Sequence, residues 1–374
     1  MNQFRPQPPP RAQLPRLPRL PRLPKEMRGC GCALVALALA AVGVFFIYWK
    51  FFRDTGPKLP KPSGGELRVV MLDVGQGDSV LVISPSGKAM LVDAGNPGNG
   101  KKVFDAMQRY GVSAIDIFVA THAHTDHIGS ADEVIRGTTV RKVIDSKVPN
   151  ATKNYEDFLR AIDEKKDIQY VAATPGQKFD DLGDGVVVTV LAPIPPFFEK
   201  KDLREGGNEP NANSVVMRLD YGEFSMLLTG DAEAQTEARI MQNGENVKAR
   251  ILKVGHHGSK YATSPDFLKE GQFEAAVISC GDKNLYGHPS PELLQRLRTA
   301  NIKVYRTDLQ GEIVVTSRGE GYDIKPAHEA TGDIWAGREA KKSDTAASGF
   351  LDPGDFSPPP RPTPAKKRAA AGGR

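Results

Sequence analysis

The chain has 374 residues, with 50 lysines and arginines against 45 aspartates and glutamates. The two ends carry this positive excess, because residues 1–28 hold seven basic and one acidic side chain and residues 338–374 hold eight and four. The body is therefore acidic and lacks the basic surface over a whole domain that nonspecific nucleic-acid binding requires. With only three cysteines in the chain, a disulfide framework and a cysteine-ligated zinc knot are excluded for the body.

Both ends are predicted to be disordered arms. Residues 1–28 contain Pro-Arg-Leu repeats, and the sequence from Arg338 onward is rich in Pro, Ala, Lys and Ser. Such segments bury too little apolar surface to offset the entropy of ordering. We therefore expect an arm at residues 1–28 and a disordered tail at residues 326–374.

An uncharged apolar run at residues 29–49 predicts one transmembrane helix, since about 20 residues at about 1.5 Å each span a hydrocarbon core of roughly 30 Å. Tyr48 and Trp49 at its end are typical of an interfacial anchor. A cleaved signal peptide is the alternative, but the run continues to Ile47, past the small residues at 38–41. Basic residues are more numerous before the span than after it. This bias predicts a single-pass protein of the cell membrane, with a cytoplasmic N-terminus and the main domain outside.

Residues 50–65 read as a Pro- and Gly-rich linker, and residues 66–325 as one folded domain. Short β-rich runs alternate there with amphipathic runs, which favours sheets covered by helices. We predict strands at 67–72, 79–83, 89–92, 115–120, 140–144, 186–191, 214–219, 224–228, 249–254, 275–279, 303–306 and 311–316. Helices are predicted at 101–110, 155–165, 232–242, 265–269 and 291–299. The long connection at 193–211 indicates the rim of an active site.

The strongest chemical signal is Thr-His-Ala-His-Thr-Asp-His-Ile-Gly at residues 121–129, directly after an apolar strand. Burying three imidazoles and a carboxylate is costly unless a cation organises them. Alternation along an extended segment points His122 and His124 the same way, toward one metal ion. Asp126 and His127, where the chain turns, can then face a neighbouring ion. A histidine-rich surface loop is the alternative.

Further candidates follow later apolar strands. Asp231 can bridge two cations about 3.5–4 Å apart, although an N-cap of the following helix is the alternative. His256 and His257 precede a Gly-Ser pair that permits close backbone approach. Either can contact the metals or a phosphoryl oxygen, and a structural role is the alternative for the one that points away. Cys280 is interpreted as a small buried hydrophobe rather than a reactive thiol.

The string at 121–129 matches the H-x-H-x-D-H signature of the metallo-β-lactamase superfamily. More narrowly, six segments resemble the hydrolase domain of the ComEC family of competence proteins, in that family's order: LDVGQGDS at 72–79, LVDAG at 91–95, LTGD at 228–231, VGHHGS at 254–259, YGHP at 286–289 and RTD at 306–308. The resemblance covers roughly residues 66–316. It implies an α/β fold, an αββα sandwich of the metallo-β-lactamase type, here preceded by the transmembrane helix.

The resemblance also assigns roles. It implies that His288 completes the second metal site, because this histidine follows the second strand after the bridging carboxylate; a histidine of the earlier pair is the alternative. The implied metal ligands are His122, His124, Asp126, His127, Asp231 and His288, and the implied catalytic residues are Asp126, His256 and His257. Residues expected to support the ligands from behind are Asp73, Asp78, Asp93, Asn213 and Ser259.

One departure from the superfamily concerns the first metal. No histidine occurs between His127 and Asp231, so the usual third imidazole is missing, and the segment 211–214 stands in its place. An oxygen-richer site leaves both zinc and manganese open as the two divalent ions.

We therefore expect a metal-dependent hydrolase of phosphodiester bonds, a nuclease or phosphodiesterase, that uses a dinuclear site and a bridging hydroxide. Nucleic acid is among the candidate substrates, and the membrane is a partner through one helix. One alternative is hydrolysis of a lactone, amide or thioester, since one fold hosts many reactions. Another is a membrane-tethered binding module with a degenerate site. A single hydrophobic stretch cannot form a DNA channel, so any role in DNA uptake is indirect.

Overall fold

The computed structural model describes residues 65–338. All of them belong to the second of the two compact units of the chain, Leu59–Arg374. The predicted N-terminal arm, the predicted membrane helix at 29–49 and residues 339–374 of the predicted tail lie outside the described residues. Residues 326–338, where the disordered tail was predicted to begin, instead contact the domain, since Arg306 donates hydrogen bonds to the carbonyl oxygens of Ile334 and Ala336. Within residues 65–338, no helix is both long enough and apolar enough to cross a membrane.

The first sheet has eight strands in the order β15-β14-β1-β2-β3-β4-β5-β6. Strands β1 to β3 and β14 to β15 pair antiparallel, whereas β3 to β6 pair parallel. The strands are β1 (Leu67–Met71), β2 (Val80–Ile83), β3 (Ala89–Val92), β4 (Ala114–Ala120), β5 (Thr139–Asp145), β6 (Gln169–Ala172), β14 (Ile313–Ser317) and β15 (Asp323–Pro326).

The second sheet has seven strands in the order β13-β12-β11-β10-β9-β8-β7. Its strands β7 to β10 pair antiparallel and β10 to β13 pair parallel. The strands are β7 (Lys178–Phe179), β8 (Val186–Ala192), β9 (Val216–Tyr221), β10 (Phe224–Leu228), β11 (Ile251–Lys253), β12 (Ala275–Ile278) and β13 (Lys303–Arg306).

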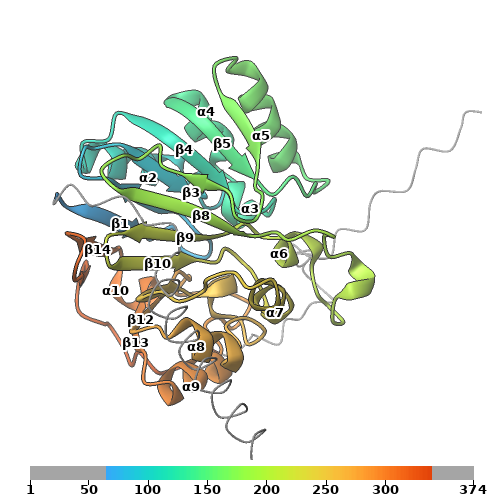
Figure 1. Cartoon of the computed structure of the whole chain (residues 1–374), viewed down its shortest axis with the longest axis vertical. Helices are drawn as coiled ribbons and strands as arrows, with labels where there is room; N and C mark the ends of the chain where they lie inside the picture. The colour runs from blue at the N-terminus through green and yellow to red at the C-terminus, as the bar shows by residue number, and fades with distance from the viewer. Residues whose placement is uncertain (1–64, 339–374) are drawn as a thin grey trace, which may run out of the picture. The chain divides into compact units, whose positions relative to one another are not determined.

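Helices cover the outer faces of both sheets (Figure 1). Those that pack on the first sheet are α2 (Gly100–Arg109), α4 (Ala131–Gly137) and α5 (Lys153–Glu164), and those that pack on the second are α7 (Ala234–Gln242), α8 (Pro265–Gly271) and α9 (Pro291–Thr299). The remaining helical turns are α3 (Thr125–Ile128), η2 (Lys200–Asp202), α6 (Glu209–Ala212), η3 (Gly255–Gly258) and α10 (Thr307–Gln310).

The apolar side chains form three layers that correspond to this arrangement. In β1, Val69 and Met71 join the core between the two sheets, whereas Val70 joins the core beneath the helices of the first sheet. This alternation follows from the two-residue period of a strand, which lets one strand serve two apolar layers. The described residues therefore form the mixed α/β sandwich that the sequence predicted.

Apart from the short helical turns α3, η2, α6, η3 and α10, four elements were not predicted: β6, β7, β15 and α4. Three of them are short strands at the edges of the sheets, where only one neighbour pairs with them. Strand β6 has only four residues, all at least partly exposed, and β15 shows little apolar character, so neither carries a clear hydrophobic pattern. Helix α4 has only seven residues, too few for a clear helical period.

Candidate metal centre

The candidate residues gather where strands of both sheets end. The string 121–129 follows β4, Asp231 follows β10, and His256 and His257 follow β11. The loop from β1 to β2 contributes Asp78 from the opposite side. Parallel strands bring their carboxyl ends to one edge of a sheet, which is why segments distant in the sequence meet here.

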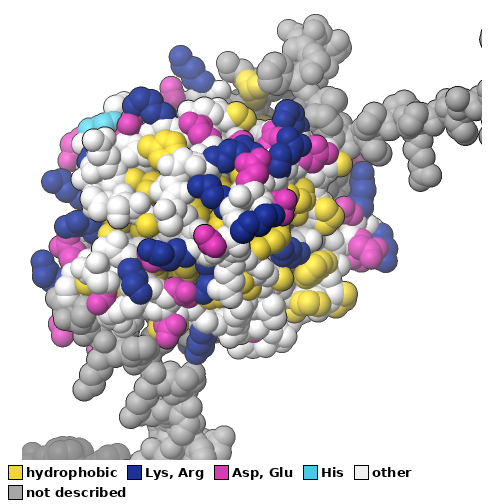
Figure 2. All heavy atoms as spheres, turned by 90° about the horizontal axis from the view of Figure 1, so that it is seen from above, with side chains coloured by type: hydrophobic (Ala, Val, Ile, Leu, Met, Phe, Trp, Pro, Cys, Tyr) yellow, Lys and Arg dark blue, Asp and Glu magenta, His cyan; other side chains and the backbone are white. Residues whose placement is uncertain are grey.

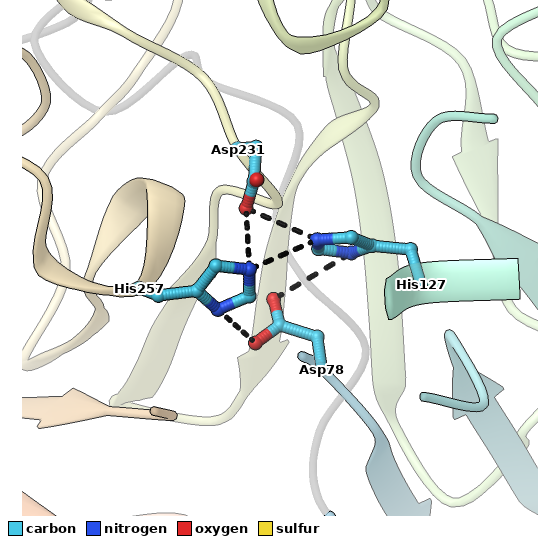
Figure 3. Close-up of side chains that lie close together, drawn as sticks. All are labelled: Asp78, His127, Asp231 and His257. Atoms are coloured by element: carbon cyan, nitrogen blue, oxygen red, sulfur yellow. Dashed lines mark hydrogen bonds and ion pairs between the residues drawn. The ribbon is translucent and has the colours of Figure 1, made fainter. Parts of the chain in front are cut away.

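Four buried side chains form the closest cluster, Asp78, His127, Asp231 and His257, and one ligand atom of each lies within 4.8 Å of all the others (Figure 3). The Nε2 atoms of His127 and His257 are 3.2 Å apart, and they lie 3.2 and 3.5 Å from Asp231 Oδ1. Asp126 joins them, with Oδ2 3.2 Å from His257 Nε2.

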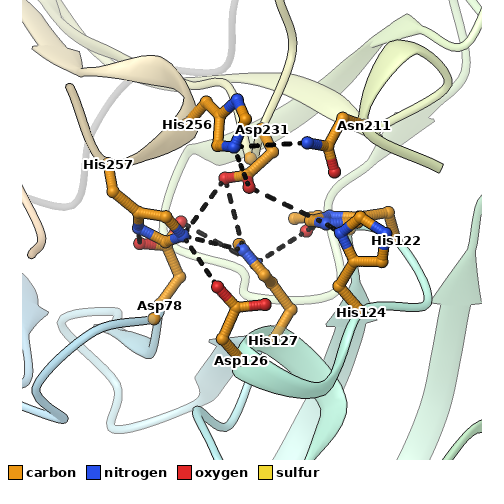
Figure 4. Close-up of polar contacts among 12 residues, drawn as sticks. Asp78, His122, His124, Asp126, His127, Asn211, Asp231, His256 and His257 are labelled. Carbon is orange, nitrogen blue, oxygen red and sulfur yellow. Dashed lines mark hydrogen bonds and ion pairs between the residues drawn. The ribbon is translucent and has the colours of Figure 1, made fainter. Parts of the chain in front are cut away.

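The other carboxylate oxygen of Asp231 faces a different group (Figure 4). Its Oδ2 lies 3.9 Å from His122 Nε2 and 3.7 Å from His256 Nε2. His124 completes this group, because its Nδ1 lies 3.0 Å from His122 Nε2. Asp231 therefore stands between two sets of imidazoles and offers one oxygen to each, as a carboxylate that bridges two cations must.

The residues fit a pair of divalent cations. Asp231 Oδ1 is buried and accepts no hydrogen bond within the described part of the chain, although a buried carboxylate oxygen normally has a donor. Imidazole and carboxylate are also the donor types that zinc and manganese take. The metal identity and the number of ions remain predictions.

Charge distribution within the cluster agrees with this fit. Burial lowers the pKa of His122 and His124, which keeps them neutral, the form that binds metal. Burial also acts to lower the pKa of His127 and His257, but the carboxylates around them outweigh it: the pKa of His127 lies well above its usual value and that of His257 rises to about 10. The carboxylates thus favour positive charge at this position, which a divalent cation can supply.

Two carboxylates hold the ligands from behind. Asp93 Oδ2 lies 2.7 Å from His127 Nδ1, and Asp93 also accepts hydrogen bonds from the backbone N–H and hydroxyl of Thr121. Asp78 lies 3.5 Å from His257 Nδ1 and pairs with the fully buried ammonium of Lys253. Both carboxylates were predicted in this role, which for a metal ligand fixes the ring orientation.

Three other residues predicted to support the ligands take different places. Asp73 is exposed, and its carboxylate accepts the N–H of Gly75. Ser259 lines the cavity but uses its hydroxyl to accept the N–H of Tyr261. The Asn213 amide bonds both backbone groups of Phe198, so it anchors a loop and does not face the ligands.

Asn211 faces the site in the place of Asn213. Its Nδ2 lies 3.3 Å from His256 Nε2, and its Oδ1 is buried with no hydrogen-bond partner among the described residues. The one-turn helix α6 separates the two asparagines by half a turn, so their side chains point apart. The sequence analysis named the right segment but chose Asn213 as the supporting amide, and the structure places Asn211 there instead.

His257 lies in the position that the resemblance gave to His288. The turn η3 holds His256 and His257 at φ of 46° and 53°, a left-handed backbone that directs His257 into the cluster. Such a conformation costs a non-glycine residue about 1–3 kcal/mol and is typical of functional sites. His288 lines the cavity, its ring centroid 5.2 Å from that of His256, and burial lowers its pKa to about 3.

The cluster opens into a cavity of about 650 Å³. Asp126, Asp231 and His257 lie in its lining, together with the loop residues Lys200 and Arg204. The predicted rim at 193–211 therefore does border the site. Figure 2 shows one face of the molecule on which basic and acidic side chains are interspersed, without a broad basic surface.

Glu233 is a buried acid that the sequence analysis did not single out. Its Oε1 lies 3.1 Å from His256 Nδ1 and accepts a hydrogen bond of 2.9 Å from Arg204. Burial raises the pKa of Glu233, but His256 and Arg204 outweigh this effect and hold it below its usual value. The sequence signal that could have identified Glu233 is its position two residues after Asp231.

The fold and the site together define a metallohydrolase of the metallo-β-lactamase fold. The family model of the metallo-beta-lactamase superfamily matches residues 72–282, and the chain belongs to that superfamily.

Its relatives are competence and recombination proteins. The chain is 32% identical over 275 residues to ComE operon protein 3 of Bacillus subtilis (strain 168), covering 67% of this chain and 33% of that protein. It is 29% identical over 278 residues to Recombination protein 2 of Haemophilus influenzae, covering 72% and 31%. It is 30% identical over 252 residues to Competence protein ComA of Neisseria gonorrhoeae, covering 66% and 32%. The chain thus spans about a third of the length of these curated relatives.

Among solved structures, the metallo hydrolase Igni18 of Ignicoccus hospitalis aligns with a TM-score of 0.44 and 18% identity, covering 67% of this chain and 98% of that chain.

Proposed function

We propose that the chain hydrolyses phosphodiester bonds with two divalent metal ions, zinc or manganese. The observation that carries this proposal is the position of Asp231, whose Oδ1 faces His127 and His257 while Oδ2 faces His122. A carboxylate shared in this way holds two cations at the separation used for displacement at phosphorus.

The ligand groups of the two ions differ. His127, His257 and Asp126 would hold one ion together with Asp231 Oδ1. His122 and His124 would hold the other together with Oδ2. The unpartnered oxygen of Asn211 supports an oxygen ligand in place of the missing third imidazole. When bound, the ions would lower the pKa of a water and stabilise the charge that develops on the phosphoryl oxygens.

The substrate class is proposed from chemistry and from relatedness. The cavity is open and polar, and its lining includes Lys200 and Arg204, which suit an anionic substrate. Relatives named as competence and recombination proteins make nucleic acid a reasonable substrate. We also propose that residues 29–49 anchor the chain in the cell membrane, with the N-terminus cytoplasmic and the hydrolase domain outside.

The test uses the full chain. Metal analysis should give two ions per chain, and the loaded protein should cleave bis-p-nitrophenyl phosphate and a single-stranded oligonucleotide but neither nitrocefin nor an acyl-lactone. Asp231→Ala should lose both metal binding and turnover, whereas His328→Ala, at an exposed histidine outside the site, should match the parent. A protein that binds two ions and leaves both phosphodiesters intact would refute the proposal.

A further inference from the structure

A second groove lies beside the cavity of the metal centre. This side groove has a volume of about 390 Å³, and it shares two of its lining residues, Arg204 and Tyr261, with that cavity. The rest of its lining comes from the first turns of α7 and α8, from the segment before α8 and from Arg296 of α9 (Figure 1). An extended molecule bound in the cavity can therefore continue into the side groove.

Arg204 and Tyr261 form a stacked pair at the boundary between the cavity and the side groove. Arg204 Cζ lies 3.4 Å from the ring centroid of Tyr261. The guanidinium is held in place, because Nη2 donates to Glu233 Oε1 at 2.9 Å and Nη1 donates to the carbonyl oxygen of Glu205 at 3.0 Å. Tyr261 is nevertheless 41% exposed and the Arg204 side chain 31%. Aromatic rings and guanidinium planes are the flat surfaces on which nucleic-acid bases stack.

Exposed apolar side chains gather at the same place. Among residues 65–338, the large exposed ones are Phe197, Tyr261, Leu285 and Tyr286. Tyr261 and Tyr286 line the cavity, and Phe197 belongs to the loop that borders it. Exposed apolar groups concentrated at one site are typical of a binding surface.

The charged residues that line the side groove are all basic. Arg296 donates to three backbone carbonyls of the segment 260–263, which are neutral acceptors and hold the guanidinium without cancelling its charge. Lys260 is exposed. Glu237 and Glu292 act electrostatically on Arg296, and Glu292 also acts on Lys260. Neither acid approaches these cations closely enough to form an ion pair in the described part of the chain, so the groove keeps positive charge for an anion.

We propose that the side groove is a nucleotide subsite, which binds the part of a single-stranded polynucleotide that adjoins the scissile bond. This inference rests on the proposed phosphodiester hydrolysis. One phosphate of the strand lies at Lys260 and Arg296. The neighbouring base stacks on the pair formed by Arg204 and Tyr261. Stacking of this kind does not select a base, because every base has a flat face. The subsite makes a strand a better substrate than a dinucleotide, which occupies the cavity alone.

The test compares three phosphodiesters in the full, metal-loaded chain: an oligothymidylate of about twelve nucleotides, thymidylyl-thymidine and bis-p-nitrophenyl phosphate. Tyr261→Ala should raise KM for the oligothymidylate on the order of 10-fold, and Lys260→Ala should raise it to a smaller degree. Both effects should be several times weaker on the two small substrates. Tyr261→Phe keeps the ring and should retain the KM of the parent. Lys269→Ala, at an exposed lysine of α8 outside the groove, is the matched control and should also match the parent.

Binding measured apart from cleavage separates the base from the phosphate. The probes are a fluorescent phosphorothioate oligothymidylate, which resists hydrolysis, and a matched strand with abasic sites. Tyr261→Ala should weaken binding of the first strand and leave binding of the abasic strand unchanged. Lys260→Ala should weaken both. It should also reduce the slope of log affinity against log salt concentration by about 0.7, the value for one phosphate contact on a single strand.

Urea unfolding controls for a purely structural role, and the midpoints of the Tyr261 and Lys260 variants should match the parent. If both alanine variants bind the resistant strand as tightly as the parent, or lose activity equally on all three substrates, the subsite is wrong while phosphodiester hydrolysis stands. If the loaded parent cleaves none of the three yet binds the strand through Tyr261 and Lys260, the proposed hydrolysis fails and the side groove stands as a binding site.

Discussion

Lys253 and Asp78 form a buried ion pair directly behind the candidate metal ligands. Their side chains are 1% and 3% exposed, and Lys253 Nζ also lies 3.4 Å from the carbonyl oxygen of Gly230. Asp78 Oδ1 has no hydrogen-bond partner among the described residues. Lys253→Met keeps most of the side-chain volume and removes the charge. We expect it to remove the largest positive charge beside Asp78, which leaves this buried carboxylate with only the imidazoles of His257 and His127 near it.

Breaking one partner of a buried pair costs about 3–5 kcal/mol. With a urea slope of about 3 kcal/mol/M, the unfolding midpoint should fall by about 1–2 M. The measurement is urea unfolding of the metal-free chain, so that metal binding does not add to stability. Lys303→Met, at an exposed lysine on β13, is the matched control and should change the free energy of unfolding by less than about 0.5 kcal/mol.

The loss should also depend on pH. Burial acts to raise the pKa of Asp78, but Lys253 and then His257 outweigh it and hold the pKa below its usual value. The pair therefore contributes stability above the usual pKa of an aspartate and loses it as the pH falls through the lowered value. In Lys253→Met, protonation of Asp78 on acidification removes the buried charge that has lost its lysine partner, so the difference from the parent should shrink toward pH 4.

A double variant separates loss of the pair from loss of packing. Adding Asp78→Asn to Lys253→Met removes both charges and should recover at least half of the lost stability. If the double variant is as unstable as Lys253→Met, or if Lys253→Met alone stays within about 1 kcal/mol of the parent, the assignment of a buried compensating charge is wrong.

Other variants test single contacts. Asn213→Ala should lower the free energy of unfolding by about 1–3 kcal/mol in urea titrations, because its amide anchors a loop, and should leave metal affinity unchanged. Asn211→Ala should leave the free energy of unfolding in urea unchanged and lower turnover about 10–100-fold. Asp145→Asn tests the coupling between protonation of Asp145 and the stability of the fold. Burial raises the pKa of Asp145, so the fold is more stable with this carboxyl group protonated and loses that stability as the pH rises through the raised pKa. The stability of this variant relative to the parent should therefore increase from pH 4 to pH 7, by roughly 1.4 kcal/mol per pKa unit in urea unfolding. Gly77→Ala should unfold earlier and bind metal more weakly in calorimetry, because φ is 137° there and a Cβ would collide with the backbone oxygen of Asp126.

Local sequence patterns were enough to predict many of the strands and helices. Strands β2 and β3 are continuous apolar runs bounded by polar residues, and helix α9 begins at Pro291 after the capping residue Ser290. These signals are contained within a few residues, so they survive without knowledge of the tertiary structure. Edge strands such as β15 carry no such pattern, because pairing with the neighbouring strand β14 is what defines them, and that pairing exists only after folding.

The residues of the candidate site also fall into those that local sequence identifies and those that only tertiary contacts identify. The string 121–129 and Asp231 could be named because each stands directly after an apolar strand, and the strand fixes where the side chain goes. The supporting residues depend on contacts between distant segments: Glu233 becomes notable only beside His256, and Lys253 only beside Asp78.

The sequence by itself therefore determined the fold class, the edge of the sheets at which the chemistry lies and the set of residue types available for metal binding. The tertiary structure decided which of the candidates lies in the closest cluster, His257 rather than His288, and which asparagine faces it, Asn211 rather than Asn213. The physical reason is direction. A strand sets side-chain direction by its two-residue period, but in turns such as η3 and α6 the direction depends on backbone angles that packing imposes. In α6 the two nearby asparagines Asn211 and Asn213 therefore point to different sides.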